Sequence, residues 1–159
     1  LNFAPTFEKN KNDMKNILFL AGILMLFSCN TSKKAKNSND LFLTGTKWTV
    51  IKIRESMATS TQTARYIELS LPSKKGEGTI TGNVGCNNFN GTYKSEKGTS
   101  KIMFSQLAST KMTCPNIDQE TRILGILEKV NSYEISGQIL KLYAGGELLL
   151  TLEGVNISQ

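Results

Sequence analysis

The stretch "SYEISGQILKLYAGGELLLTLE", residues 132–153, decides how the C-terminal part of this chain folds. Apolar and polar residues alternate over three short segments, residues 132–136, 138–144 and 147–153. A period of two is typical of β-strands, because successive side chains of a strand point to opposite faces of the sheet. Glycine-containing tripeptides separate the segments and indicate tight turns. The pattern therefore predicts an antiparallel meander of three strands.

Similar short segments precede this meander. They cover residues 46–53, 65–71, 79–85, 91–96 and 101–107, and Gly or Asn residues interrupt them. Their period of two predicts further strands, about eight in all. A sheet of this size in one small domain is expected to be strongly curved and barrel-like.

The segment "PNIDQETRILGILEKV", residues 115–130, has a helical pattern instead. Its apolar residues Ile123, Ile126, Leu127 and Val130 recur at helical spacing. Asn116 is expected to cap the helix, with Gln119 in a capping-box arrangement. Asp118 and Glu120 fall in the first turn, where the helix dipole favours acidic side chains. The sequence thus predicts an α+β domain in which one amphipathic helix packs on the curved antiparallel sheet.

A different pattern lies near the N-terminus, in "MKNILFLAGILMLFSC", residues 14–29. The apolar run of eleven residues from Ile17 to Phe27 is shorter than the about 20 residues that a membrane-spanning helix needs. Together with Lys15 it fits a secretory signal peptide. The alternative is a buried core helix in which Cys29 is an ordinary buried thiol.

The end of this run, Leu26-Phe27-Ser28-Cys29, resembles the lipobox of bacterial lipoproteins. The resemblance implies a lipoprotein signal peptide at 14–28 and a triacylated Cys29, carrying chains such as palmitate, as the mature N-terminus. Residues 1–13 are then an upstream or non-native segment. Residues 30–40 lack any large apolar residue, so with Cys29 they form a lipidated, flexible linker over 29–40.

The chain from residue 41 onward resembles the META-domain family, which includes heat-shock-inducible lipoproteins of bacterial outer membranes. The resemblance covers about residues 41–155 of an expected domain at 41–159, and implies a small domain with a curved antiparallel sheet but no particular reaction. The residues that carry it are Trp48, Gly85, Cys86, Asn87, Gly91, Tyr93, Thr110, Met112, Cys114 and Pro115.

Two of these motif stretches have a physical reading of their own. Gly85 and Gly91 bracket a turn in which Asn87 and its neighbour Asn88 are expected to hydrogen-bond nearby backbone. Cys86 and Cys114 are the cysteines of the domain, and an exported protein meets an oxidising compartment. A Cys86–Cys114 disulfide is therefore expected; the alternative is two buried free thiols.

Composition narrows the function classes. The chain has no His, which removes the commonest general base and the commonest metal ligand. We therefore assign no catalytic, cofactor-binding or metal-binding residue. The net charge is +6, but Lys33, Lys34 and Lys36 lie in the linker, so a nucleic-acid partner is not expected.

These observations predict a non-enzymatic, lipid-anchored protein of the cell envelope. Its expected partners are the membrane, through acylated Cys29, and an unidentified envelope protein. The domain is expected to be monomeric and to bind or support this protein. The family resemblance adds a role in envelope stress tolerance. Asn30 after Cys29 resembles sorting to the outer membrane, on the periplasmic face. The alternative is a small-ligand carrier whose curved sheet encloses an apolar cavity.

Overall fold

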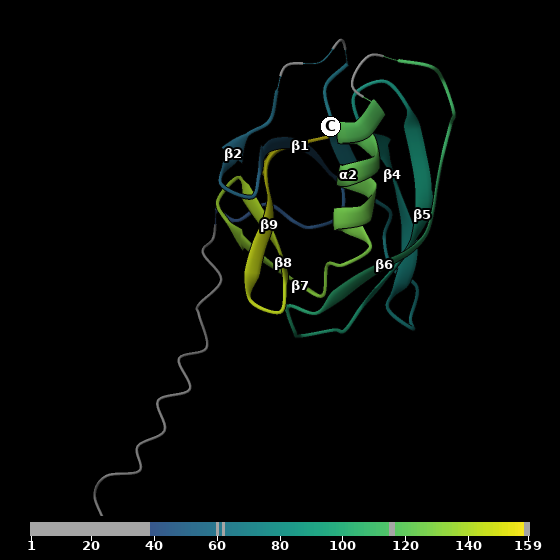
Figure 1. Cartoon of the computed structure of the whole chain (residues 1–159). Helices are drawn as coiled ribbons and strands as arrows, with labels where there is room; N and C mark the ends of the chain where they lie inside the picture. The colour runs from purple at the N-terminus through teal and green to yellow at the C-terminus, as the bar shows by residue number, and fades with distance from the viewer. Residues whose placement is uncertain (1–38, 60, 62, 115–116, 158–159) are drawn as a thin grey trace, which may run out of the picture. The chain divides into compact units, whose positions relative to one another are not determined.

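The structure is a computed structural model that describes residues 39–59, 61, 63–114 and 117–157. The expected signal peptide, Cys29 and most of the linker lie outside these residues, as do Pro115 and Asn116. The elements are β1 (Thr46–Ile53), β2 (Ser56–Met57), β3 (Tyr66–Leu69), β4 (Glu77–Asn83), β5 (Asn88–Ser95), β6 (Ile102–Ser109), α2 (Ile117–Leu127), β7 (Ser132–Ser136), β8 (Ile139–Ala144) and β9 (Glu147–Asn156) (Figure 1).

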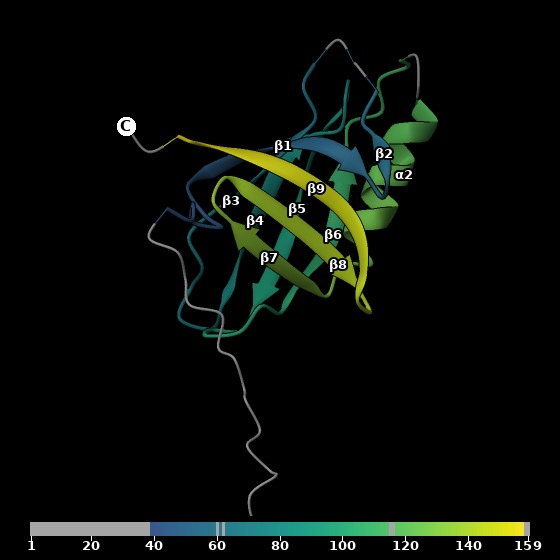
Figure 2. The ribbon, with the colours of Figure 1, turned by 90° about the vertical axis from the view of Figure 1, so that its left-hand side faces the viewer.

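The strands form one antiparallel sheet that curls into a half-barrel (Figure 2). The strand order is β6-β5-β4-β3-β1-β9-β8-β7, and the short β2 pairs with β1. The two edge strands approach each other at one end, where an isolated bridge joins Lys101 to Ser132. Next to it the backbone N–H of Tyr133 donates to the carbonyl oxygen of Ser100 at 2.9 Å. The sheet therefore nearly closes at this end.

Irregular strand pairing bends the sheet. The register shifts between Val50 and Lys52 on β1 and between Asn90 and Thr92 on β5, and such bulges increase local bending and twist. Gly91 lies within the second shift. A Cβ atom on Gly91 would lie 2.9 Å from the backbone oxygen of Ser105 on β6, closer than a side chain can lie without a shift of the backbone. This motif glycine is therefore required by the close approach of β5 and β6.

Helix α2 lies across the open side of the curved sheet (Figures 1 and 2). Its apolar face, Ile123, Ile126 and Leu127, is buried with the inward side chains of the strands in one core. All fully buried core residues lie between Trp48 and Leu152, and residues 36–159 form one compact unit. This unit contains a complete core, so we expect it to fold without the preceding segment.

The structure confirms the predicted fold class, the helix and the C-terminal meander β7–β8–β9. The bounds of β1 and β7 agree with the predicted segments to the residue. Strand β2 was not predicted, because two residues are too few to show a period. In the described part of the chain, no helix has the length and apolar character needed to cross a membrane.

The motif residue Tyr93 fastens β5 to the chain beyond β3. Its side chain is 1% exposed, and its hydroxyl donates to the carbonyl oxygen of Ser70 at 2.6 Å. The ring lies against Gly78, where an added Cβ would be 2.5 Å from Tyr93 Cε1. Burial raises the pKa of Tyr93, and the nearby Tyr133 raises it further. The folded state therefore favours the neutral phenol.

Tyr93→Phe is expected to lower the free energy of unfolding by about 1–2 kcal/mol near neutral pH, because the Ser70 carbonyl loses its donor. The raised pKa of Tyr93 means that its contribution is complete below the ordinary value of 10.0 and is lost as pH rises through the folded-state value. Urea unfolding should therefore show a smaller difference in the free energy of unfolding between wild type and Tyr93→Phe at about pH 11 than at about pH 8. An unchanged or growing difference would contradict the assignment.

Candidate functional site

Asn87, in the turn between β4 and β5, joins the two motif stretches. Its side chain is 1% exposed, and its Oδ1 accepts from the backbone N–H of Met112 at 2.8 Å and the hydroxyl of Thr110 at 2.7 Å. Its Nδ2 donates to the carbonyl oxygen of Met112 at 3.3 Å. The amide therefore pairs with both backbone groups of Met112, much as a neighbouring strand would.

Glu120, in the first turn of α2, connects the helix to the same asparagine. The side chain of Glu120 is 4% exposed. Its Oε2 accepts from Asn87 Nδ2 at 2.8 Å and from the backbone N–H of Asn87 at 3.3 Å. Hydrogen bonds to an ionised acceptor are stronger than neutral ones, and stronger still away from water. One buried carboxylate thus holds α2 to the β4–β5 turn.

Arg65 lies on the other side of the turn and is 3% exposed. Its guanidinium donates to the carbonyl oxygen of Thr59 at 2.6 Å and to Gln119 Oε1 at 2.8 Å. A Cβ atom on Gly85 would lie 3.3 Å from Arg65 Nε and 3.5 Å from Glu120 Oε1, so the opposite charges face each other across this glycine. Burial lowers the pKa of Arg65, and the charge of Glu120 acts in the opposite direction.

A disulfide completes the arrangement. Cys86 and Cys114 are bonded across a sequence separation of 28, with their Cα atoms 6.5 Å apart. The bond ties the β4–β5 turn to the segment that leads into α2, as predicted. We call the five residues Arg65, Cys86, Asn87, Cys114 and Glu120 the motif cluster.

Not all of the motif residues belong to this cluster. Trp48 is fully buried in the core, where its indole N–H donates to the carbonyl oxygen of Leu43 at 3.0 Å, and Gly91 and Tyr93 lie further along β5. Among the described residues, therefore, only part of the motif gathers around the β4–β5 turn.

The prediction that the Asn87 and Asn88 side chains hydrogen-bond nearby backbone is right for neither, although Asn88 does hold the turn through a neighbouring side chain. Asn88 Oδ1 accepts from Asn83 Nδ2 at 2.8 Å within the turn. The prediction for Asn87 is wrong, because its side chain reaches residues 25 and 33 positions further along the chain. Gln119 Oε1 likewise accepts from Arg65, and the capping partner expected for Gln119 lies outside the described residues.

The roles of Arg65 and Glu120 in this cluster were not predicted from the sequence, which placed Glu120 only in the first turn of the helix. For Glu120 a signal was present: it lies three residues before Ile123 and seven before Leu127, on the face of the helix that is buried. No comparable signal marks Arg65, which only precedes a strand. Its role depends on the tertiary approach of the β4–β5 turn.

A surface pocket of about 470 Å³ lies beside the motif cluster, between the end of β6 and α2. Met112 and Ile117 stand at this pocket with 58% and 44% of their surfaces exposed, and the half-buried Leu124 also lines it. Polar residues around them include Ser109, Thr110, Lys111 and Thr121. The pocket combines an apolar centre with a polar rim.

The polar groups of the motif cluster contact one another. The two sulfur atoms are bonded together, and Asn87 uses both its donor and its acceptor atoms. Within the residues that the structure describes, no three His, Cys, Asp or Glu side chains are grouped so as to hold a metal ion. The cluster is thus suited to fixing the shape of the neighbouring pocket.

Comparison with known protein families identifies the family to which these motifs belong. The model of the META domain family matches residues 41–155, which contain every residue of the motif cluster. The chain belongs to the META domain family. In this META domain the Gly-Cys-Asn stretch at 85–87 and the Thr-x-Met-x-Cys stretch at 110–114 form one interlocked structure.

Solved structures share the fold of this META domain. The NMR structure of a protein from Burkholderia xenovorans matches with a TM-score of 0.55 and 22% identity, covering 71% of this chain and 83% of that one. A second NMR structure matches with a TM-score of 0.55 and 20% identity, covering 74% of this chain and 95% of the other. A search of curated proteins finds no match.

Proposed function

We propose that this chain is a lipid-anchored protein of the bacterial cell envelope, whose META domain binds or supports another envelope protein and catalyses no reaction. The apolar run that ends at Cys29 and the polar segment after it support the anchor. Asn30 after Cys29 resembles sorting to the outer membrane and supports a place on its periplasmic face. The resemblance to heat-shock-inducible lipoproteins adds a role in envelope stress tolerance.

The observation that carries the proposal is the way the motif cluster clamps Met112. Both backbone polar groups of Met112 are bonded to Asn87, and the disulfide fixes Cys114 two residues further on. The exposed Met112 side chain therefore projects from a backbone that is held on both sides. A contact residue that is ordered before binding loses less entropy when a partner binds.

The surface around Met112 has the chemistry of a protein-binding site. Met and other apolar residues are enriched at the centres of protein interfaces, and polar residues surround them. Met112 and Ile117 supply the apolar centre here, and Lys111 and Thr121 belong to the rim. The partner is expected to offer an apolar side chain to the pocket and polar groups to its rim.

The packing of the core gives less support to the alternative of an apolar ligand carrier. Trp48, Tyr93 and Leu140 are among the large side chains that are fully buried inside the curved sheet. The pocket beside the motif cluster lies at the surface, between β6 and α2. Binding at the surface is therefore the better-supported function.

Site-specific photo-crosslinking in cells tests this proposal. A photoreactive residue at Ile117 should yield one discrete protein adduct, and the same residue at Val155, which is 64% exposed on β9, should not. Met112→Asp in the Ile117 background should abolish the adduct without lowering the thermal stability. Identical adduct patterns from the two positions, or an adduct that survives Met112→Asp, would contradict a binding role for the pocket.

A further inference from the structure

Two lysine-bearing turns lie side by side at one end of the sheet. The first precedes β4 and carries Lys74 and Lys75; the second, between β5 and β6, carries Lys97. A surface pocket of about 580 Å³ lies between them. We call it the lysine pocket, and the residues that define it are Lys74, Lys75, Lys94, Lys97, Lys101, Ile102 and Met103.

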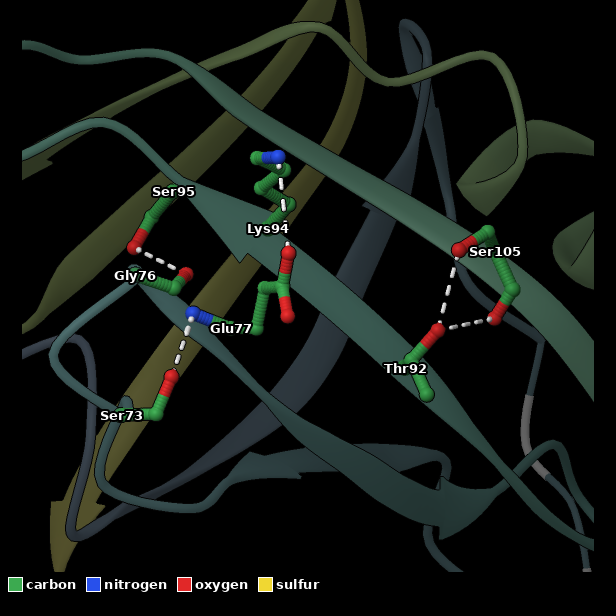
Figure 3. Close-up of polar contacts among 7 residues, drawn as sticks. All are labelled: Ser73, Gly76, Glu77, Thr92, Lys94, Ser95 and Ser105. Atoms are coloured by element: carbon green, nitrogen blue, oxygen red, sulfur yellow. Dashed lines mark hydrogen bonds and ion pairs between the residues drawn. The ribbon is translucent and has the colours of Figure 1, made fainter.

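The backbone of the first turn is held tightly against β5 (Figure 3). Gly76 N–H donates to the Ser73 carbonyl oxygen at 2.9 Å, and Ser95 N–H donates to the Gly76 carbonyl oxygen at 2.8 Å. Gly76 has φ +78°, and a Cβ there would lie 2.2 Å from the Ser95 carbonyl oxygen. Lys74 and Lys75 therefore extend from a turn whose position is set by close backbone packing.

The second turn is closed by its own hydrogen bonds. The backbone N–H and the hydroxyl of Thr99 both donate to the carbonyl oxygen of Glu96, at 3.1 Å and 2.9 Å. Gly98 has φ +78°, a conformation that favours glycine. Lys97 is thus presented by a defined turn.

The charges of the lysine pocket are not balanced. Five lysines line it, and two acidic residues lie against them, Glu96 in the pocket and Glu77 beside Lys94, which leaves an excess of 5 − 2 = 3 positive charges. Exposed ion pairs hold two of the lysines: Lys94 pairs with Glu77 at 3.4 Å (Figure 3) and Lys101 with Glu96 at 3.0 Å. No ion pair to a described residue holds Lys74, Lys75 or Lys97. Like charges gathered in one concave site attract anions.

One exposed apolar side chain lines the lysine pocket, and another shortly precedes the first turn in the sequence. Met103 lines the lysine pocket and is 56% exposed, and Leu71, two residues before the first turn, is 81% exposed. A soluble anion needs only the lysines. Exposed apolar groups beside lysines suit a membrane surface, where the apolar side chain enters the acyl boundary and the ammonium group meets the headgroup.

We propose that the lysine pocket binds the phosphate-bearing headgroups of anionic lipids, with Leu71 and Met103 inserting between them. The inference is independent of the protein-binding pocket at Met112, and it does not require the anchor. With the anchor in place, the eleven residues 30–40 would span at most about 40 Å. That reach is ample for a domain whose radius of gyration is about 13–14 Å, so the lysine pocket can meet the membrane.

The test is vesicle co-sedimentation of residues 36–159, the unit that contains the complete core. Vesicles of equal parts phosphatidylcholine and phosphatidylglycerol should bind the domain, and pure phosphatidylcholine should not. Each surface lysine contributes about 1 kcal/mol to binding an anionic membrane. The triple variant Lys74→Gln/Lys75→Gln/Lys97→Gln should therefore bind on the order of a hundredfold more weakly.

A matched control separates this site from general charge attraction. Lys47→Gln/Lys52→Gln/Lys141→Gln changes the net charge equally outside the lysine pocket and should retain most of the affinity. Equal loss in both triple variants, or equal binding to both vesicles, would overturn the proposal. Leu71→Ser/Met103→Ser should weaken vesicle binding. If this variant binds vesicles as tightly as the wild type, and inorganic pyrophosphate binds as well as the vesicles do, the site binds soluble phosphates and the lipid assignment is wrong.

Discussion

Removing the disulfide by the paired substitution Cys86→Ala/Cys114→Ala is expected to lower the free energy of unfolding by ~3.5 kcal/mol. The bond closes a loop with a sequence separation of 28, and a loop of that length restricts the unfolded chain by about this amount in the chain-entropy model. Denaturant unfolding of residues 36–159, with and without reductant, measures the effect. This segment has no other cysteine, so the reductant acts on one bond.

The paired variant is also the control for reduction. Reductant should destabilise the wild type to the level of Cys86→Ala/Cys114→Ala and leave the variant unchanged. If reductant leaves the stability of the wild type unchanged, the two thiols are not bonded in the protein. Reduction should also loosen the segment around Met112, which the disulfide holds together with Asn87.

Glu120→Ala is expected to cost about 3 kcal/mol of folding free energy. The carboxylate accepts from both the side-chain and the backbone N–H of Asn87, and a hydrogen bond to a charged group is worth about 1.5–3 kcal/mol. Alanine leaves the Asn87 donors without their acceptor, and it leaves the buried Arg65 without the opposing charge. Both losses act against the folded state.

Two further variants test whether the buried charge of Glu120 causes this loss of stability. Glu120→Gln keeps an acceptor oxygen but removes the charge, so its free energy of unfolding should lie between those of wild type and Glu120→Ala. Glu128→Ala removes an exposed carboxylate just after α2 and should stay within about 0.5 kcal/mol of wild type. If Glu120→Ala cost no more than Glu128→Ala, the carboxylate would not be holding the helix to the turn.

The fold could largely be predicted from the sequence, because several strands, such as β1, β3 and β8, have one buried and one exposed face. In β8, Leu140 and Leu142 are buried and the intervening Lys141 is not, which produces the period of two. Helix α2 shows the corresponding helical period in Ile123, Ile126 and Leu127. Such local patterns carry the information for strands and helices directly.

The candidate sites depend on tertiary pairing and could be predicted only in part. The cysteines suggested their own bond, but nothing local indicates that Asn87 reaches Met112 and Glu120 rather than its own turn. The lysine pocket likewise requires that β4 and β5 pair, because that pairing sets Lys75 and Lys97 side by side from separate turns. The pattern of residues along one segment does not show which distant segments it contacts in the folded protein.

The most direct test of the proposed envelope role is the intact mass of the full-length protein, purified from bacterial membranes without reductant. We predict a chain that begins at a triacylated Cys29 and lacks the two thiol hydrogens of Cys86 and Cys114. A mass that retains Met14–Ser28, carries no acyl chains and shows reduced thiols would contradict the anchor and the envelope location together.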